Sequence, residues 1–347
     1  MKKIVLLRIS MAAVLVFAAL AAPLAAQTGE MPQDFHQILF TDYQGYTYRA
    51  SSTLESPDYP YIGEYGMQSL FDGDQYSGWS EGVGGDGTGE VLWMEITAGC
   101  DTLLIKNGFS RSMDLFYKNN RVQSLDVSLW IGYLPAGMVT EYGPLYVAAP
   151  AGQYETLRLE DIREVQEHQF VFDYEAARRK GRQLEEKFVK YAKGEDLPPS
   201  AEKTVFLLRM EITEVYPGNL WNDTCLTELR CFDSGRFESV EMASLEGALR
   251  YRKADGIWRF LYAESEMLYD PYLLSPGGRW CVGFTAPKSA GGRLETGYAL
   301  FRLPYPELFE HEGFEEALNE GKLPVEFQAA GDSLDLVFDD GSTIRLE

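Results

Sequence analysis

A loop rich in glycine and acidic residues is the segment of this sequence best suited to binding chemistry. It runs from Leu70 to Glu90 and mixes glycines with carboxylates and hydroxyl groups. Glycine has no Cβ, so the backbone of such a loop can approach a ligand closely. Side-chain oxygens suit a hard cation or a polyhydroxylated ligand. We interpret the loop as the recognition edge of a β-sandwich.

The sequence offers no comparable sign of a catalytic centre. It contains no P-loop and no Ser/His/Asp signature. The histidines His36, His168 and His311 are scattered and CxxC is absent, so a zinc site is not predicted. Glycosidases need two carboxylates at a set separation, but a chain with 53 acidic residues produces acidic pairs by chance. We predict a protein that is not an enzyme and has no catalytic residue.

The first residues have the pattern of a secretory signal peptide. A basic start with Lys2, Lys3 and Arg8 precedes a short apolar run, and small residues lead to Ala26. The apolar run is short compared with the roughly 20 residues that span a bilayer. We therefore predict cleavage after Ala26, a secreted or periplasmic protein and no membrane insertion after cleavage. The alternative is an uncleaved membrane anchor.

The composition is strongly acidic, with 31 basic and 53 acidic residues and a net charge of −22. No basic stripe is available to neutralise phosphates, which argues against nucleic acid and anionic lipid surfaces as partners. The charge permits cation binding. A solvated acidic surface explains it equally well.

Behind the loop, the pattern predicts a mostly β chain with two domains. Short strand-like runs separated by turns are typical of a sandwich or barrel. After a linker over 27–45, they fill residues 46–232, and a second β-rich (α+β) unit follows over 236–347. The stretch 174–200 interrupts the first set, because Ala177, Leu184, Phe188 and Tyr191 are spaced for one face of a helix. We predict a helical insertion between two strands there.

Four cysteines could form one disulfide in an exported protein. Cys225 and Cys231 lie six apart in a strand-like run, which would place them on one face about 20 Å apart. They cannot pair with each other in an extended strand, whereas Cys100 could pair with either. Alternatively, all four cysteines, including Cys281, are buried free thiols.

Seven segments of the first domain form a recognisable set: Ala50–Leu54, Leu70–Asp74, Trp79–Glu90, Ile105–Phe109, Phe116–Val122, Val215–Gly218 and Asp223–Leu229. Together they resemble the NADase-type glycan-binding domain, a discoidin-like, galactose-binding-like jelly roll of exported bacterial proteins. The resemblance covers about residues 46–232 and leaves 236–347 unassigned. It implies a carbohydrate-binding module without the hydrolase. Ser77 stands where the family more often has Thr, and Thr88 where it has Ile.

The resemblance also implies a structural calcium site. It would use Asp72, Asp74 and Ser77 in the loop and Glu228 on the closing strand. Together with backbone carbonyls, these could supply the 6–8 oxygens that calcium prefers. Alternatively, the two aspartates cap the turn through backbone N–H groups, and Glu228 pairs with an arginine or a buried amide.

The candidates for glycan contact are residues of the same domain: Trp79 for stacking, Glu81 and Glu90 as hydroxyl acceptors, and Asn107 and Arg121 for bidentate hydrogen bonds. Each also has a structural interpretation. The tryptophan would pack in the core, Asn107 would form a turn with Gly108, and Arg121 would form a salt bridge with one of the two glutamates.

The sequence thus predicts an exported, noncatalytic protein that binds a glycan or a cell-envelope polymer through the loop edge of a β-sandwich. The alternative is a protein–protein interaction module of the envelope. In that case the sandwich is a scaffold, and the 174–200 segment or the C-terminal unit forms the contact.

Overall fold

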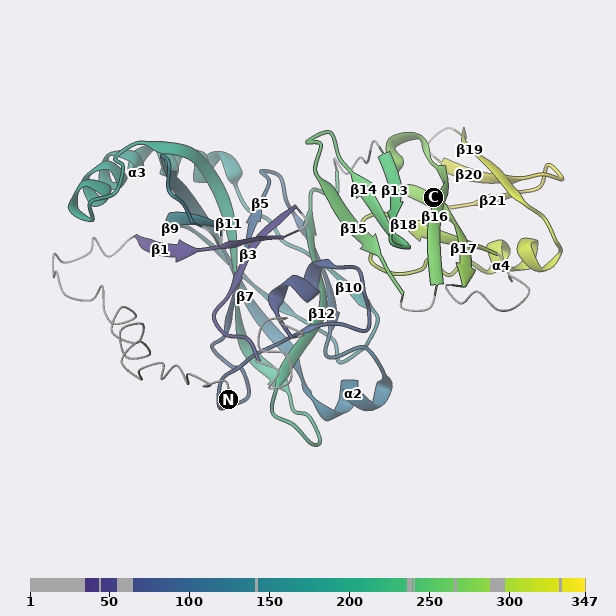
Figure 1. The fold of residues 1–347 in the computed structure, drawn as a ribbon, viewed down its shortest axis with the longest axis horizontal. Coiled ribbons are helices and arrows are strands. Elements are labelled where there is room, and N and C mark those ends of the chain that lie inside the picture. Colours follow the sequence, from purple (N-terminus) through teal and green to yellow (C-terminus); the bar gives the residue numbers. More distant parts are fainter. Residues whose placement is uncertain are drawn as a thin grey trace, which may run out of the picture.

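The computed structural model describes residues 35–43, 45–54, 65–140, 143–235, 239, 241–264, 267–287, 297–330 and 333–346. The predicted signal peptide, 1–26, lies outside these residues. Figure 1 shows a large β-rich unit followed by a smaller one, coloured green to yellow. The architecture is mostly β, as the sequence predicts. Within the described residues, no helix is both long and apolar enough to cross a membrane.

The larger unit is built on one extended sheet with strand order β10-β6-β12-β7-β11-β5-β3-β2. Its strands are β2 (Thr41–Tyr43), β3 (Tyr46–Ala50), β5 (Val91–Ile96), β6 (Thr102–Asn107), β7 (Asn120–Pro135), β10 (Val165–Gln169), β11 (Ala201–Tyr216) and β12 (Thr224–Phe232). Strands β1 (His36–Leu39), β4 (Trp79–Ser80), β8 (Val139–Thr140) and β9 (Gly143–Arg158) pair beside this path. The long strands β7 and β11 run through the whole unit.

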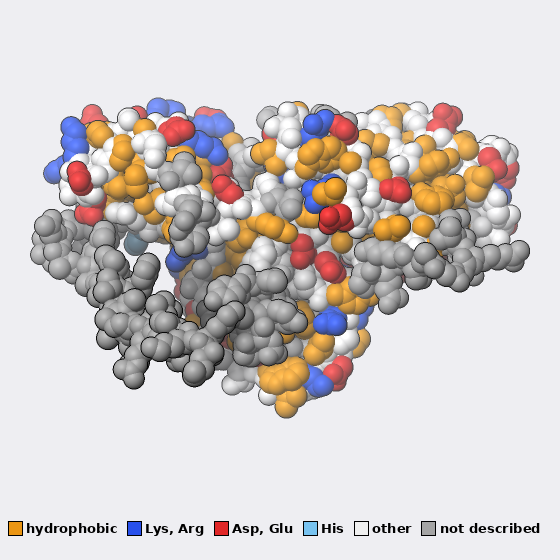
Figure 2. All heavy atoms as spheres, in the orientation of Figure 1, with side chains coloured by type: hydrophobic (Ala, Val, Ile, Leu, Met, Phe, Trp, Pro, Cys, Tyr) orange, Lys and Arg blue, Asp and Glu red, His pale blue; other side chains and the backbone are white. Residues whose placement is uncertain are grey.

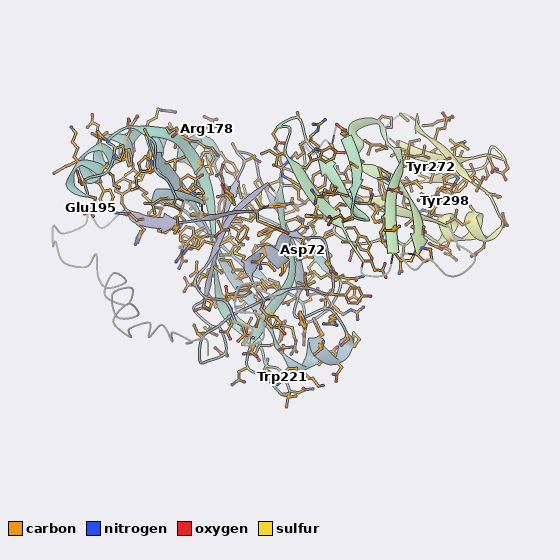
Figure 3. The ribbon with its side chains drawn as sticks, in the orientation of Figure 1. Asp72, Arg178, Glu195, Trp221, Tyr272 and Tyr298 are labelled. Atoms are coloured by element: carbon orange, nitrogen blue, oxygen red, sulfur yellow. A yellow bond between two sulfur atoms is a disulfide. The ribbon has the colours of Figure 1, made fainter. Side chains whose placement is uncertain are left out.

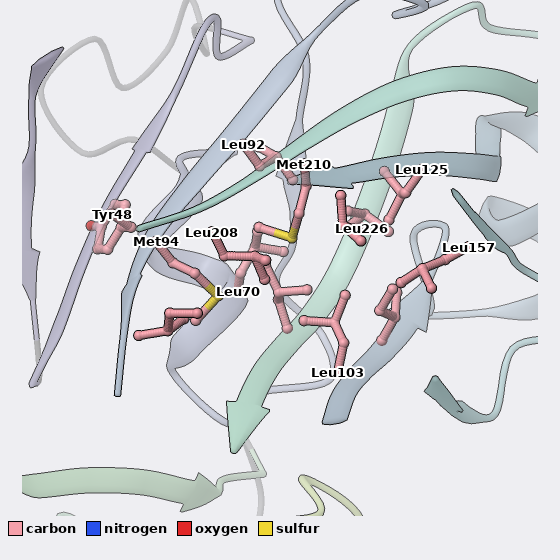
Figure 4. Packing of buried hydrophobic residues seen from close by; sticks show 14 of the residues in the cluster. Tyr48, Leu70, Leu92, Met94, Leu103, Leu125, Leu157, Leu208, Met210 and Leu226 are labelled. Atoms are coloured by element: carbon pink, nitrogen blue, oxygen red, sulfur yellow. The ribbon is translucent and has the colours of Figure 1, made fainter. Parts of the chain in front are cut away.

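Alternation of inward and outward side chains forms the core of this unit. In β5, Leu92, Met94 and Ile96 are buried, whereas Trp93 points to the opposite side of the sheet and is half-buried there. Figure 4 shows the packing of the resulting cluster. Ten labelled members are Tyr48, Leu70, Leu92, Met94, Leu103, Leu125, Leu157, Leu208, Met210 and Leu226.

Residues 27–45 are not simply the linker that the sequence predicts. In the described part of this range, β1 and β2 are strands. His36 pairs with Ala148 at the start of an antiparallel ladder between β1 and β9, and β2 pairs with β3. Ile38 and Phe40 are buried in a second cluster with Tyr146 and Leu207. Burial of these apolar side chains fixes the segment against the sandwich.

The predicted helical insertion is present as α3 (Tyr174–Gly194). Asp173 caps it by accepting a hydrogen bond from the Ala176 amide at 2.8 Å. Its apolar face packs on the sheet, where Phe188 stacks on Tyr133 with ring centroids 4.8 Å apart. The helix is amphipathic and docked on the sandwich through one face.

In its described residues, the smaller unit contains three three-stranded sheets, the α-helix α4 (Glu312–Asn319) and a short 3-10 helix, Pro276–Gly278. The strands are β13 (Glu241–Leu245), β14 (Ala248–Arg252), β15 (Trp258–Tyr262), β16 (Met267–Leu274), β17 (Trp280–Pro287), β18 (Gly297–Arg302), β19 (Pro324–Ala330), β20 (Ser333–Phe338) and β21 (Thr343–Arg345). One buried cluster joins Leu104 and Phe232 of the larger unit to Leu249, Tyr251 and Phe301 of the smaller one. The two units therefore share a core.

A disulfide joins Cys100 to Cys231 across 131 positions. It links the turn before β6 to the end of β12. Cys225 and Cys281 are buried thiols, and burial raises the pKa of each to about 12. Of the pairings that the sequence leaves open, the structure contains the one between Cys100 and Cys231.

Candidate functional site

The Asp72–Ser77 turn is held by its own side chains. The Asp72 carboxylate accepts hydrogen bonds from the Asp74 amide and the Ser77 hydroxyl, both at 2.8 Å. Asp74 accepts from the Tyr76 amide at 2.9 Å. This is the capping arrangement that short acidic side chains give a turn. Burial raises the pKa of Asp72 to about 7, although its hydrogen bonds and Arg230 oppose the rise.

Glu228, the expected partner of this turn, forms a buried ion pair on β12. Its Oε2 lies 2.7 Å from Nη1 of Arg230, and both side chains are at most 2 % exposed. The same arginine donates to the carbonyl oxygen of Leu70 at 2.5 Å, which ties the pair to the turn. Burial raises the pKa of Glu228 well above its usual value, and the charge of Arg230 opposes that rise.

The oxygens of the turn suit a hard cation. The Ser77 hydroxyl oxygen lies 3.0 Å from the Asp74 carbonyl and 3.4 Å from the Ser69 carbonyl, in addition to its contact with Asp72. Carbonyl, hydroxyl and carboxylate oxygens together form the ligand type that calcium takes. The carboxylates alone do not make a site, since no three acidic, histidine or cysteine side chains in the described ranges converge at metal-binding spacing.

The turn also lies against the C-terminal unit. The Gly73 carbonyl accepts a hydrogen bond from the Ala263 amide at 2.8 Å, and Gln75 donates to the Tyr262 hydroxyl at 3.1 Å. A Cβ on Gly73, whose φ is +72°, would lie 2.9 Å from the Tyr262 nitrogen. This part of the expected recognition edge is therefore a contact between the two units. Figure 3 labels Asp72 beside that contact.

Trp79 is a core residue, which corrects its expected role in stacking on a sugar. The side chain is fully buried, and its Nε1 donates to the Ser52 carbonyl at 3.1 Å. The indole fills the interior beneath the β4–β12 pairing. No ring face is left for a ligand.

Asn107 and Arg121 are corrected in the same way, because both hold backbone in place. Asn107 is fully buried, donates to the Val122 carbonyl at 2.7 Å and accepts from the Val122 and Gly108 amides. Arg121 forms a bidentate pair with Asp161 at 2.9 and 2.8 Å. The expected salt bridge to a glutamate of the glycine loop is therefore replaced by one to Asp161.

Glu81 and Glu90 fasten the glycine loop to the sandwich. Buried Glu81 accepts from the Val83 amide at 2.6 Å, and burial raises its pKa. Glu90 accepts from the hydroxyls of Ser51 and Ser52. These bonds occupy the carboxylates that were expected to meet sugar hydroxyls.

A groove of about 740 Å³ opens elsewhere, between β1 and the face of the sheet opposite the main core. We call it the tryptophan–arginine groove and define it by Trp93, Trp130, Arg49 and Arg209 on its floor and His36 of β1 on its wall. The two indoles meet edge to face with ring centroids 5.0 Å apart. His36 lies against Trp130 at 5.4 Å. The volume falls in the range of small-ligand sites.

Strand register positions the floor of this groove. Arg49 of β3 lies opposite Trp93 of β5, which lies opposite Arg209 of β11. Directly opposed residues share a face of a sheet, so the three side chains form one row. The guanidinium of Arg209 lies 5.8 Å from the centroid of the Trp93 ring. Aromatic faces flanked by hydrogen-bond donors are a common arrangement for binding polar ligands.

A second exposed surface lies at the loop edge near α2 (Met113–Lys118). We call it the loop-edge patch and define it by Met113, Tyr117, Leu220 and Trp221, which are between 40 % and 61 % exposed. The Lys118 carbonyl accepts hydrogen bonds from the amides of Leu220 and Trp221 at 3.2 and 2.9 Å. Figure 3 places Trp221 at this end of the molecule, and Figure 2 shows hydrophobic side chains exposed there.

One comparison with known proteins, the match to a family model, agrees with the fold of the larger unit. The family model described as the NAD glycohydrolase translocation F5/8 type C domain matches residues 42–232. Among solved structures, the arabinofuranosyltransferase AftD from Mycobacteria is similar at 10% identity and a TM-score of 0.29, over 70% of this chain. This chain spans 17% of the length of that protein. A search of the curated proteins finds no match.

The matched residues include the loop, β12 and the strands that carry the tryptophans and arginines of the groove, but not β1, and they make up more than half of the chain. A domain of this discoidin-like type is a binding or translocation module and is consistent with carbohydrate or protein binding. The chain belongs to the NAD glycohydrolase translocation F5/8 type C domain family.

Proposed function

We propose that this protein is exported and noncatalytic, and that it binds a glycan or another cell-envelope polymer along the tryptophan–arginine groove. The groove itself carries the proposal, because it is an open site of about 740 Å³ with two half-buried indoles on its floor. Indole faces stack on the C–H faces of sugar rings, and arginine and histidine donate to hydroxyls. The signal-like first residues support export. The acidic composition argues against nucleic acid as the partner.

A glycan array that includes bacterial wall fragments tests this proposal. The protein beginning at Gln27 is applied with and without calcium. We expect saturable binding that falls about fivefold or more in Trp93→Ala and Trp130→Ala, taking for a sugar ring the roughly 1–3 kcal/mol that a base gains by stacking on an aromatic ring. Trp221→Ala is the matched control, because this tryptophan is exposed but lies outside the groove.

Two results would contradict the proposal. One is a blank array from protein that is folded by circular dichroism. The other is binding that survives both groove substitutions. Trp93→Phe keeps an aromatic ring at the site and separates loss of the stacking surface from loss of the fold.

We also propose that a calcium ion binds in the Asp72–Ser77 turn. The support is the approach of the Ser77 hydroxyl to the Ser69 and Asp74 carbonyls and to Asp72. When bound, the ion would brace the turn, with Glu228 as the nearest acid on β12. Calcium should raise the melting temperature of the native protein, and Ser77→Ala should weaken that effect. An identical melting temperature with calcium and with a chelator would exclude the site.

The second candidate function is protein binding in the cell envelope, and the loop-edge patch favours it. Four large apolar side chains gather there, two on α2 and two on a loop that backbone hydrogen bonds tie to this helix. In that case Trp221→Ala would abolish capture of the partner, whereas Trp93→Ala would leave it intact. The helix α3 is a poorer candidate for this contact because its apolar face is already packed on the sheet.

A further inference from the structure

We infer that the tryptophan–arginine groove selects an anionic saccharide, one whose rings carry carboxylate or sulfate groups. This inference rests on the proposed function and adds the class of ligand to it. Its starting observation is that charge in the groove is opposite in sign to that of the protein as a whole.

Among the described residues, those that line the groove include Arg49, Arg209 and His36 but no aspartate or glutamate. The chain as a whole has 53 acidic residues and a net charge of −22. A site shaped for neutral sugars needs no such exclusion, because carboxylates are good acceptors for sugar hydroxyls. Their absence beside two arginines favours an oxyanion on the ligand.

The two guanidinium groups flank the stacking surface. Because Arg49, Trp93 and Arg209 form one cross-strand row, a ring stacked on the indole would have an arginine on each side. A planar guanidinium matches the geometry of a carboxylate or sulfate and can bind it through two parallel hydrogen bonds. The row therefore combines a sugar-stacking face with two oxyanion donors.

The two arginines differ in how much charge they have available. Arg209 forms an ion pair with Glu211 at 2.8 Å, so part of its charge is already neutralised. Arg49 is exposed, and Nη1 donates to the Leu39 carbonyl at 3.0 Å, which orients the side chain beside β1. That contact uses one of its five N–H donors. Arg49 is therefore the main anion-binding residue, and Arg209 assists it.

Matched polymers separate charge from sugar recognition. The probes are polygalacturonate with its methyl ester for the carboxylate, and dextran sulfate with dextran for the sulfate. We expect one acidic member to bind at least about tenfold more tightly than its neutral counterpart, with affinity falling as salt rises from about 50 to 500 mM.

Substitutions then assign this preference to the groove. Arg49→Gln should lower affinity for the acidic polymer by about tenfold and change affinity for its neutral counterpart little. Arg178→Gln is the control, since Arg178 is an exposed arginine on α3 outside the groove. Arg49→Lys keeps the charge without the planar fork and should restore only part of the affinity.

The outcomes distinguish this inference from the proposed function. Equal binding of acidic and neutral polymers, lost in Trp93→Ala, would overturn the inference and leave glycan binding in place. Acid-selective binding that Arg49→Gln and Arg209→Gln do not change would also overturn it. No binding to any polymer, together with a blank glycan array, would overturn both.

Discussion

The indole of Trp79 lies in the core of the sandwich, with its N–H bonded to the Ser52 carbonyl. Trp79→Ala would leave a large cavity, and we expect it to lower the free energy of unfolding by about 3–5 kcal/mol. Trp79→Phe should cost less and leave ligand affinity unchanged in protein that remains folded. Urea unfolding and binding assays on both variants check this. A folded Trp79→Phe that has lost all binding would place the ligand near Trp79 instead.

His168 on β10 gives stability a dependence on pH. Its Nε2 is buried and has no hydrogen-bond partner in the described part of the chain, and burial lowers the pKa of the imidazole below 6.5, against the opposing charge of Glu160. The unfolded chain therefore binds the proton more readily, so the free energy of unfolding should fall as pH drops below about 6.5. Above that pH this contribution is fully present.

His168→Gln removes this titration. We expect the difference in unfolding free energy between the wild type and the variant to change between pH 8 and pH 5, with the wild type losing more stability in acid. Urea titrations at several pH values measure it. Parallel loss in both proteins would show that carboxylates alone cause the acid sensitivity.

At the scale of elements, helix α3 contains a glycine in its middle, Gly181, at a position where the structure has room for a larger side chain. A Cβ on Gly181 would meet Ile131 at 3.5 Å and the Tyr133 hydroxyl at 3.7 Å, which are ordinary contact distances. Gly181→Ala should therefore raise the free energy of unfolding by roughly 0.5–1 kcal/mol. Gly194→Ala, at the end of the helix, is a useful comparison and should have a smaller effect. A destabilised Gly181→Ala would show that α3 packs more tightly on β7 than these contacts indicate.

The same helix shows what a local pattern can predict. Ala177, Leu184, Phe188 and Tyr191 repeat at helical spacing, and all four are buried on one face. The segments that resemble the family also lie in the matched domain. The strands of residues 36–43 were not predicted, because Ile38 and Phe40 alternate over too short a stretch to stand out.

The groove could not be predicted from the sequence, because its residues come from different strands. Arg49, Trp93 and Arg209 meet only through the register of β3, β5 and β11. Strand β5 does contain a signal for one groove residue, the alternation of its side chains. Trp93 lies between buried Leu92 and Met94, so its side chain must point to the opposite side of the sheet. Conversely, residue type alone could not show that Asn107 and Arg121 are buried and bound to backbone.

At the scale of the whole molecule, the disulfide between Cys100 and Cys231 closes a long loop. For a separation of 131 residues, the chain-entropy model assigns it roughly 5 kcal/mol. Replacing both cysteines by alanine should lower the free energy of unfolding by an amount of this order. Thiol titration of the unfolded, unreduced protein should find Cys225 and Cys281 only. Four reactive thiols would contradict the pairing.

The tryptophans of this protein report on all of its candidate surfaces at once, so 19F NMR of protein labelled with 5-fluorotryptophan tests the central claim most directly. The chain has 6 tryptophans: Trp79, Trp93, Trp130, Trp221, Trp258 and Trp280. Single Trp→Phe variants assign the resonances, and an oligogalacturonate and the strongest neutral glycan from the array are titrated in turn. The account predicts that a bound saccharide shifts the resonances of Trp93 and Trp130 and leaves those of buried Trp79 and Trp280 in place. Shifts confined to Trp221 would move the site to the loop-edge patch and contradict the groove.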